Sequence, residues 1–334
     1  MRAAPVAAGS AGPAPGSSIG VVAECWRRES AVDCRAARMC LTHPTGAIRM
    51  AAVVRAVRTM RSNLAQPLSL TSLAHAALLS PYHFHRVFRH VTATTPARYL
   101  AALRMAEAKR LLACTSTSVT EIRASVGYAS LGTFTSQFNR LVGTSPRTFR
   151  ELMADIGGRP VTELLATLHG RLGPDAGGTG GGTGDGTHSG SGGGPHGGTG
   201  SGARVGPIGL VTGGPHEDAL VLLGLFGSGV PQQRPAACAV ATTPGVTRLG
   251  AVPDGVYHTL AVGFDPSATV LQALADHRAP VCFVGASRRP VVVTDGRSAD
   301  TFHVMLHRPR FTDAPVVLAL PLLVAAELAG PTAR

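Results

Sequence analysis

The sequence predicts a multidomain protein with an all-α domain, a flexible glycine-rich linker and a mostly β, sandwich-like domain at its C-terminal end. Three observations lead to this prediction. Apolar residues recur at spacings of three and four between residues 51 and 153, as on one face of an α-helix. Glycine dominates residues 173–202. Short apolar and β-branched runs, separated by Gly, Pro and Asp, fill residues 203–328.

These composition changes divide the chain into four segments. Residues 1–47 are rich in Ala, Gly, Pro and Ser without periodicity, which predicts a disordered tail. Residues 48–160 form the helical domain, and residues 161–202 hold a short helix and the linker. A linker of about 30 glycine-rich residues reaches roughly 30 Å, so we expect it to tether residues 203–328 without fixing their orientation.

Positive charge is concentrated in the helical domain. The chain has a formal net charge of +12, and residues 50–153 supply +10 of it, with 13 basic and 3 acidic residues. Residues 51–100 contain no acidic residue. A concentrated basic domain is typical of nucleic-acid binding, and a merely solvated positive face is the alternative.

The helical domain contains an internal repeat. One copy runs SPYHFHRVF and continues through ATTPARY, and the other runs SLGTFTSQF and continues through GTSPRTF. Five pairs of equivalent residues stand 50 positions apart: Ser80 and Ser130, Phe84 and Phe134, Phe88 and Phe138, Pro96 and Pro146, and Tyr99 and Phe149. Chance rarely keeps five such pairs in register, so the sequence predicts two structurally equivalent units.

Each copy predicts a helix with one buried and one polar face. Ser80 and Ser130 are suitable N-caps. The two phenylalanines of each copy lie four residues apart and therefore share a face. Another short helix precedes each copy, over Leu70–Ala77 and Val119–Val126. A helix, a tight turn and a second helix with a polar outer face make a helix-turn-helix, whose second helix is the recognition helix that enters the DNA major groove.

These segments resemble the double helix-turn-helix module of AraC/XylS-family transcriptional regulators. The resemblance covers residues 51–153 and rests on SPYHFHRVFRHVTATTPARYLAALRMAEAKRLL and VTEIRASVGYASLGTFTSQFNRLVGTSPRTFR. Residues Pro96–Leu112 resemble the helix that connects the two units in this family. The resemblance implies recognition helices at about 81–91 and 131–141, which enter successive major grooves on one side of the DNA.

The residues expected to contact DNA lie on the outer faces of these two helices. The candidates are Tyr82, His85, Arg86, Arg89, Leu131, Gly132, Thr133, Ser136, Gln137 and Arg140. The resemblance implies base contacts from the first three and from Leu131, Gly132, Thr133 and Ser136. Arg86 is the best candidate for a guanine contact, with a phosphate contact or an internal ion pair as the alternative. For Tyr82 and His85, the alternative is packing or a backbone contact.

Three positions depart from the family pattern. Leu78 stands where the first turn often has glycine, so we expect a differently shaped turn. Arg123 replaces a small alanine and is expected to crowd the second helix pair. Gly132 and Ser136 are small where longer polar side chains are common, so the second unit is expected to read fewer bases and to rely on phosphate contacts.

The C-terminal part has the pattern of an antiparallel sandwich or small barrel. The expected strands are Ala219–Phe226, Ala236–Thr242, Tyr257–Phe264, Val281–Val284, Val291–Thr294 and Thr301–Leu306, with one helix at Thr269–His277. This part loosely resembles the transthyretin-like or carboxypeptidase-regulatory β-sandwich. One hypothesis places a small-molecule effector pocket among Phe226, Gln232, Arg234, Tyr257 and His303; the alternative is a folding or dimerising domain.

We predict no enzymatic activity, no cofactor and no metal site. The six cysteines lack zinc-ligand spacing and are expected to be free thiols: Cys25, Cys34, Cys40, Cys114, Cys238 and Cys282. Their spacing also disfavours a DNA-repair methyltransferase that carries the same helical module. A hydrolase site at Ser298, Asp300 and His303 is disfavoured because neighbours on a strand point to opposite faces. No run of 18 apolar residues predicts a membrane span, and we expect a cytoplasmic protein.

The sequence therefore predicts a sequence-specific transcriptional regulator. Its expected partners are a double-stranded DNA operator, RNA polymerase if the protein is an activator, and a small-molecule effector at the C-terminal domain. The alternative is an architectural DNA binder without sequence preference, which shares the positive charge but has no need of a matched pair of recognition helices.

Overall fold

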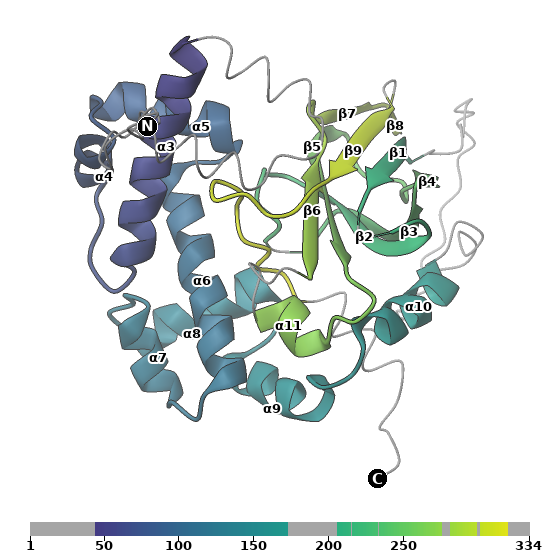
Figure 1. The fold of residues 1–334 in the computed structure, drawn as a ribbon, viewed down its shortest axis with the longest axis horizontal. Helices are drawn as coiled ribbons and strands as arrows, with labels where there is room; N and C mark the ends of the chain where they lie inside the picture. The colour runs from purple at the N-terminus through teal and green to yellow at the C-terminus, as the bar shows by residue number, and fades with distance from the viewer. Residues whose placement is uncertain are drawn as a thin grey trace, which may run out of the picture.

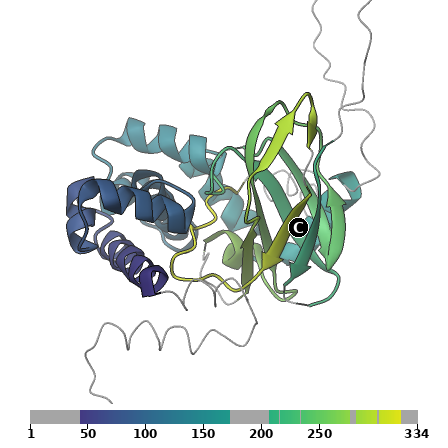
Figure 2. The ribbon, with the colours of Figure 1, turned by 90° about the horizontal axis from the view of Figure 1, so that it is seen from above.

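The computed structural model describes residues 44–172 and 206–319, apart from 215, 233, 276–280 and 299–300. A helical part and a β part lie side by side (Figure 1, Figure 2). The expected glycine-rich linker and most of the expected N-terminal tail lie outside the described residues. Residues 44–47, which we assigned to that tail, belong to the first helix of the structure.

The helical part holds two helix pairs joined by a long central helix, α6, with one pair toward each of its ends (Figure 1). Its helices are α3 (Pro44–Ser62), α4 (Leu70–Ala76), α5 (Pro81–Thr92), α6 (Pro96–Cys114), α7 (Val119–Ser125), α8 (Leu131–Val142), α9 (Pro146–Ile156) and α10 (Val161–Leu172).

Apolar spacing and N-terminal caps explain these helices. Ser69, Thr95, Ser118 and Ser145 each accept a hydrogen bond from a backbone N–H of the first turn. The first helix, α3, ends at Ser62. The central helix α6 is buried on most sides, because both helix pairs and the β part pack on it.

The β part contains two sheets. Its strands are β1 (Ile208–Gly213), β2 (Ala219–Phe226), β3 (Ala237–Thr243), β4 (Gly245–Arg248), β5 (Gly255–Phe264), β6 (Cys282–Ala286), β7 (Val291–Thr294), β8 (Arg297–Ser298) and β9 (Phe302–Leu306). One short helix, α11 (Val270–Ala275), lies between β5 and β6 in sequence. The apolar and β-branched runs predicted as strands match β2 and β7 residue for residue, whereas β1, β4 and β8 were missed.

The long strand β5 organises the larger sheet, whose order is β3-β2-β5-β7-β8. Along one edge β5 pairs with β2, and along the other it pairs first with β7 and then with β6. The smaller sheet has the order β4-β1-β9, and β1 runs parallel to β9. The expectation of a wholly antiparallel β part was therefore wrong for this pair. An apolar core fills the space between the sheets and includes Val221, Leu223 and Phe302.

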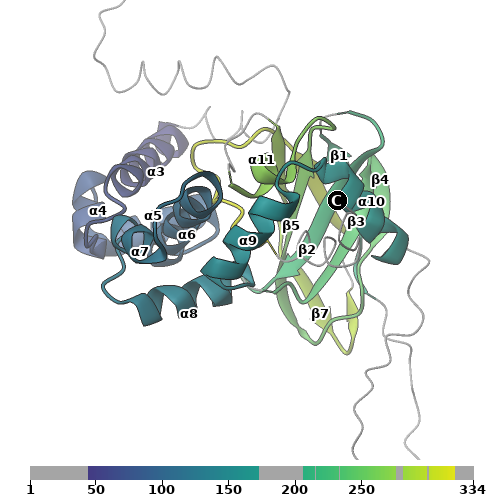
Figure 3. The same cartoon turned by 90° about the horizontal axis from the view of Figure 1, so that it is seen from below.

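The outer face of the larger sheet packs against helices. Buried residues of α6, α9 and α10 form one continuous cluster with Phe264, Leu274 and Val317 of the β part. Figure 3 shows α10 alongside β2 and β3, and α9 leading into it. The glycine-rich linker led us to expect free relative orientation of the two parts. The structure contradicts this, because a shared apolar core and several hydrogen bonds join them.

Residues 311–319, which we call the strap, make many of these hydrogen bonds. The hydroxyl of Tyr99 on α6 donates to the carbonyl of Asp313 at 2.9 Å. The backbone N–H of Ala319 donates to the carbonyl of Val142, the last residue of α8, at 3.1 Å. The strap is also tied to the β part, where the N–H groups of Val317 and Leu318 donate to the carbonyl of Pro231.

Candidate nucleic-acid interface

Two equivalent helix pairs, α4–α5 and α7–α8, form the candidate interface. In each pair, a seven-residue helix is followed by a turn and a 12-residue recognition helix. Both turns use one left-handed residue, Leu78 with φ 60° and Gly127 with φ 80°. The expectation that Leu78 reshapes the turn was therefore wrong at this position. Leu78 adopts the glycine-type conformation, and its side chain is 75% exposed.

The ends of the two recognition helices are also equivalent. Ser80 Oγ accepts from the N–H of His83 at 3.4 Å, and Ser130 Oγ accepts from the N–H of Thr133 at 3.2 Å. At the other end, Ala93 and Gly143, which stand 50 positions apart, both cap the helix with positive φ. The internal repeat in the sequence is therefore a repeat of backbone conformation.

Buried aromatic rows hold each recognition helix in place. In the first unit, the ring centroids of Phe84 and Phe88 lie 5.5 Å apart, and those of Phe88 and Tyr99 lie 5.4 Å apart. In the second unit, Phe134, Phe138 and Phe149 repeat this row at 5.8 Å for each step. All six side chains are fully buried, which confirms the buried face predicted for each copy.

The opposite face of each recognition helix is open to solvent. Tyr82 is 80% exposed and Leu131 46% exposed. Arg86, Arg89, Gly132, Thr133, Ser136 and Arg140 are also exposed, whereas His85 and Gln137 are half-buried. A side chain at Gly132 would meet no atom within 4 Å, so this position leaves the start of α8 flat. The structure thus exposes the candidate residues, and their contacts with DNA stay a prediction.

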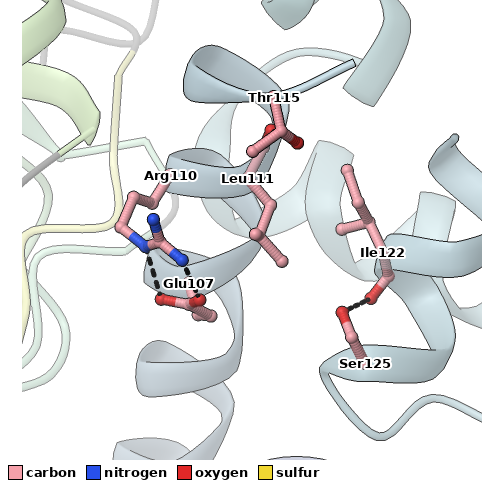
Figure 4. Close-up of polar contacts among 6 residues, drawn as sticks. All are labelled: Glu107, Arg110, Leu111, Thr115, Ile122 and Ser125. Atoms are coloured by element: carbon pink, nitrogen blue, oxygen red, sulfur yellow. Dashed lines mark hydrogen bonds and ion pairs between the residues drawn. The ribbon is translucent and has the colours of Figure 1, made fainter. Parts of the chain in front are cut away.

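Each acidic residue between 51 and 153 is engaged away from the recognition helices. Glu107 binds Arg110 through two hydrogen bonds on α6, as Figure 4 shows. Glu151 pairs with Arg147 at 2.8 Å. Glu121 belongs to the capping box of α7, and its hydrogen bonds with Ser118 lower its pKa. The recognition helices therefore keep a surface of positive and neutral groups.

Arg86 and Arg89 remain available on α5. Within the described part of the chain, neither side chain makes an ion pair or a hydrogen bond, so an internal ion pair for Arg86 finds no support there. On α8, Arg140 donates to the side-chain oxygen of Gln137 at 2.6 Å. A guanidinium held by a neutral amide keeps its full positive charge for phosphate or base contacts.

Two further arginines, Arg123 and Arg104, stabilise the helical part through hydrogen bonds to backbone carbonyls. Arg123 donates to the carbonyls of Tyr128 and Ala129 at 2.5 and 2.7 Å, so it braces the turn before α8. The expectation that it crowds the helix pair was wrong, because its long side chain reaches past α7 to the turn. Arg104 of α6 donates to the carbonyls of Leu64 and Gln66, in the connection between α3 and α4. Its guanidinium also lies 5.8 Å from the ring centre of Tyr128, so it contacts both units.

The β part flanks the first recognition helix. An open hollow of about 630 Å³ is lined by His258 of β5 together with Tyr82, His85, Arg86 and Arg89 of α5. A Cβ on Gly229 would come within 2.7 Å of Ala93, the cap of α5, which shows how closely the two parts approach. Nothing in the sequence indicated that His258 lies beside α5, because the two are more than 160 residues apart.

The effector pocket proposed from the sequence does not form. Phe226 lines a cavity beside His258, but the other four residues do not line it. Tyr257 faces the opposite side of β5 and donates to the carbonyl of Pro253, while His303 lies on β9 and pairs with Thr212. The disfavoured hydrolase set is also dispersed, with Ser298 on β8 and His303 on β9, in different sheets. Asp300 lies outside the described residues.

Three of the six cysteines lie within the described residues. Cys114, Cys238 and Cys282 form no disulfide bond with one another; the other three cysteines lie outside the described residues. Over the described ranges, no group of three His, Cys, Asp or Glu side chains is arranged to hold a metal ion. None of the helices in those ranges combines the length and apolar character needed to cross a membrane.

Comparison with known protein families matches residues 73–152 to a helix-turn-helix domain. Residues 73–152 form an AraC-type helix-turn-helix domain. This AraC-type domain runs from the middle of α4 to the middle of α9, and thus includes both recognition helices.

Several curated proteins share this region. The chain is 33% identical over 90 residues to the bifunctional transcriptional activator/DNA repair enzyme AdaA of Bacillus subtilis, covering 27% of this chain and 43% of AdaA. It is 36% identical over 92 residues to the transcriptional activator RhaS of Escherichia fergusonii, covering 28% of this chain and 33% of RhaS. The chain thus spans less than half the length of these relatives.

Among solved structures, an AraC-type transcriptional regulator from Chromobacterium violaceum is 30% identical with a TM-score of 0.31. The match covers 31% of this chain and 94% of that one. The DNA-binding domain of AdpA in complex with a target DNA is 29% identical with a TM-score of 0.29, over 30% of this chain and 90% of that one.

Proposed function

We propose that this protein is a sequence-specific DNA-binding transcriptional regulator whose α5 and α8 enter adjacent major grooves. The observation that carries the proposal is the matched pair of recognition helices, each with the same serine cap, buried aromatic row and left-handed end. Two identically mounted helices present two similar faces at a fixed spacing, which is what reading two half-sites requires. The names of AdaA and RhaS, both called transcriptional activators, support it further.

In this proposal, Arg86 contacts guanine, and Tyr82 and His85 contact neighbouring bases. Arg89 and Arg140 bind phosphates and set the register of each helix. The flat start of α8 at Gly132 lets that helix approach the groove closely, with Leu131, Thr133, Ser136 and Gln137 at its edges. The protein would act in the cytoplasm on a double-stranded operator, and would contact RNA polymerase if it activates transcription.

A binding-site selection with the purified full chain tests this function. Wild type should enrich a motif with two half-sites about one helical turn apart. Arg86→Ala should relax the preference at one position, with a loss of about 1–3 kcal/mol on the selected site. Arg110→Ala is the matched control, because it removes the same charge from α6, where Glu107 neutralises it; it should leave the motif unchanged.

The architectural alternative gives a different result. If no motif is enriched, and wild type and Arg86→Ala bind every duplex with the same steep salt dependence, the positive surface is an electrostatic platform and the proposal is wrong.

A further inference from the structure

A cavity of about 240 Å³ lies where the β part meets the helical part. Its floor is the outer face of the larger sheet. Its other walls are α11, the strap and the last turn of α5 with its cap, including Val91 and Ala93. The cavity is therefore built from segments that are far apart in sequence, and it shares only His258 and Ala93 with the open hollow beside the exposed face of α5.

Strand register explains why the floor is smooth and apolar. Leu222, Val262 and Val284 stand side by side across β2, β5 and β6. In the next row on the same face, Gly224 has no side chain and lies beside Leu260. The alternate residues of these strands point into the core between the sheets. The side chains of Leu222, Val262, Leu260 and Val284 are only partly buried, and the first two also contact the apolar cluster that the helices form.

The polar groups of the lining disfavour a charged ligand. Among the described residues, no arginine or lysine lines the cavity, and the one carboxylate there, that of Asp313, lies 3.7 Å from Nδ1 of His307. Burial lowers the pKa of His258 and raises the pKa of the Cys238 thiol, so both are neutral near pH 7. Within the described residues, the imidazole ring of His258 makes no hydrogen bond, which leaves its ring nitrogens available to a ligand.

We propose that this cavity binds a neutral, mainly apolar molecule of about two fused rings, whose single hydroxyl group bonds to His258. The size follows from scale, since a cavity of roughly 150 Å³ holds benzene and the present one is larger by about half. Dispersion contacts with the floor supply most of the binding, and His258 selects a hydrogen-bonding group over a purely apolar one.

The test uses the purified full chain and 1-naphthol as the probe, measured by isothermal titration calorimetry without DNA. Because no DNA is present, a failure here leaves the proposed DNA-binding function untouched. Wild type should bind 1-naphthol at one site and should bind 1-naphthyl phosphate, which has the same rings and a negative charge, at least tenfold more weakly.

Two matched variants locate the site. Val262→Trp fills the cavity and should reduce the affinity for 1-naphthol at least tenfold. Val256→Trp makes the same change on the same face of β5 at an exposed position outside the cavity, and should leave the affinity unchanged. Equal effects from the two variants, tighter binding of the phosphate, or no binding by wild type would overturn the proposal.

His258→Phe provides a test that does not depend on filling the cavity. It should reduce the affinity for 1-naphthol about tenfold. The affinity for naphthalene, which lacks the hydroxyl group, should change by no more than about twofold. An equal change for both compounds would show that His258 does not select the hydroxyl. If 1-naphthol binds only after removal of residues 320–334, the occupant is the chain itself and the proposal is wrong.

Discussion

The Nζ atom of Lys109 lies 3.1 Å from the carbonyl oxygen of Val317 and 3.2 Å from that of Val316. This is the only lysine of the chain, and it is fully buried between α6 and the strap. Lys109 joins α6, which connects the two helix-turn-helix units, to the strap, which packs on the β part. Because a buried ammonium group loses its hydration, burial lowers the pKa of Lys109 to about 7, and the nearby Cys282 offsets only part of this.

The first prediction concerns the pH dependence of stability. Unfolded Lys109 keeps its proton up to its ordinary pKa of 10.5, whereas folded Lys109 loses it near pH 7. The unfolded state therefore binds more protons between these values, so the free energy of unfolding should rise with pH above 7. The slope is at most about 1.4 kcal/mol per pH unit. Urea unfolding from pH 6 to 9.5 should show this rise in wild type and a smaller rise in Lys109→Met.

The pKa of Lys109 can also be measured directly by NMR titration of its side chain. Lysine labelled with ¹³C at Cε should give a single side-chain signal, whose titration midpoint in the folded protein is near 7. A midpoint above 9.5, or equal slopes for wild type and Lys109→Met, would contradict the prediction.

The second prediction concerns the strained turn of the first unit. Leu78 holds a left-handed backbone that disfavours side chains, and its own side chain is exposed. Leu78→Gly should therefore raise the free energy of unfolding by about 1 kcal/mol, measured by chemical denaturation. Leu78→Ala is the control, because it removes the exposed side chain but keeps Cβ and the strain. A gain of the same size in both variants would assign the effect to the exposed leucine instead.

The third prediction concerns the brace at the second turn. Arg123→Ala leaves the carbonyls of Tyr128 and Ala129 without their guanidinium donor, and should lower the free energy of unfolding by about 1–2 kcal/mol. Arg147→Ala removes an equally charged but exposed side chain from α9 and should cause no measurable change. An increase in stability for Arg123→Ala would restore the expectation that this arginine crowds the helix pair.

The fourth prediction concerns the coupling of the two units through Arg104. Arg104→Met loses the hydrogen bonds to Leu64 and Gln66, so α5 and α8 should no longer be held at one relative orientation. We expect the Kd for a selected two-half-site duplex to rise about tenfold or more, while the Kd for a single half-site changes by less than threefold. Arg110→Met, on the same helix, should change both equally and slightly. Fluorescence anisotropy on the two duplexes measures this, and parallel losses on both would argue against a coupling role.

Local sequence was sufficient for much of the helical part. The serine caps and the phenylalanine pairs act over three or four residues, so their spacing alone predicted two equivalent units. Apolar and β-branched runs are also a local signal, which is why β2 and β7 were found. The very short strand β8 was missed because its two residues, Arg297 and Ser298, are polar.

The sequence by itself determined the two helix-turn-helix units and the faces that they expose, because short-range periodicity and capping decide both. Only the tertiary structure decided that the β part docks on those units, that His258 stands beside α5, and that the strap buries Lys109. These contacts join residues more than 150 positions apart. They depend on shape, burial and hydrogen-bond partners that come together only in the folded chain, and no local pattern encodes them.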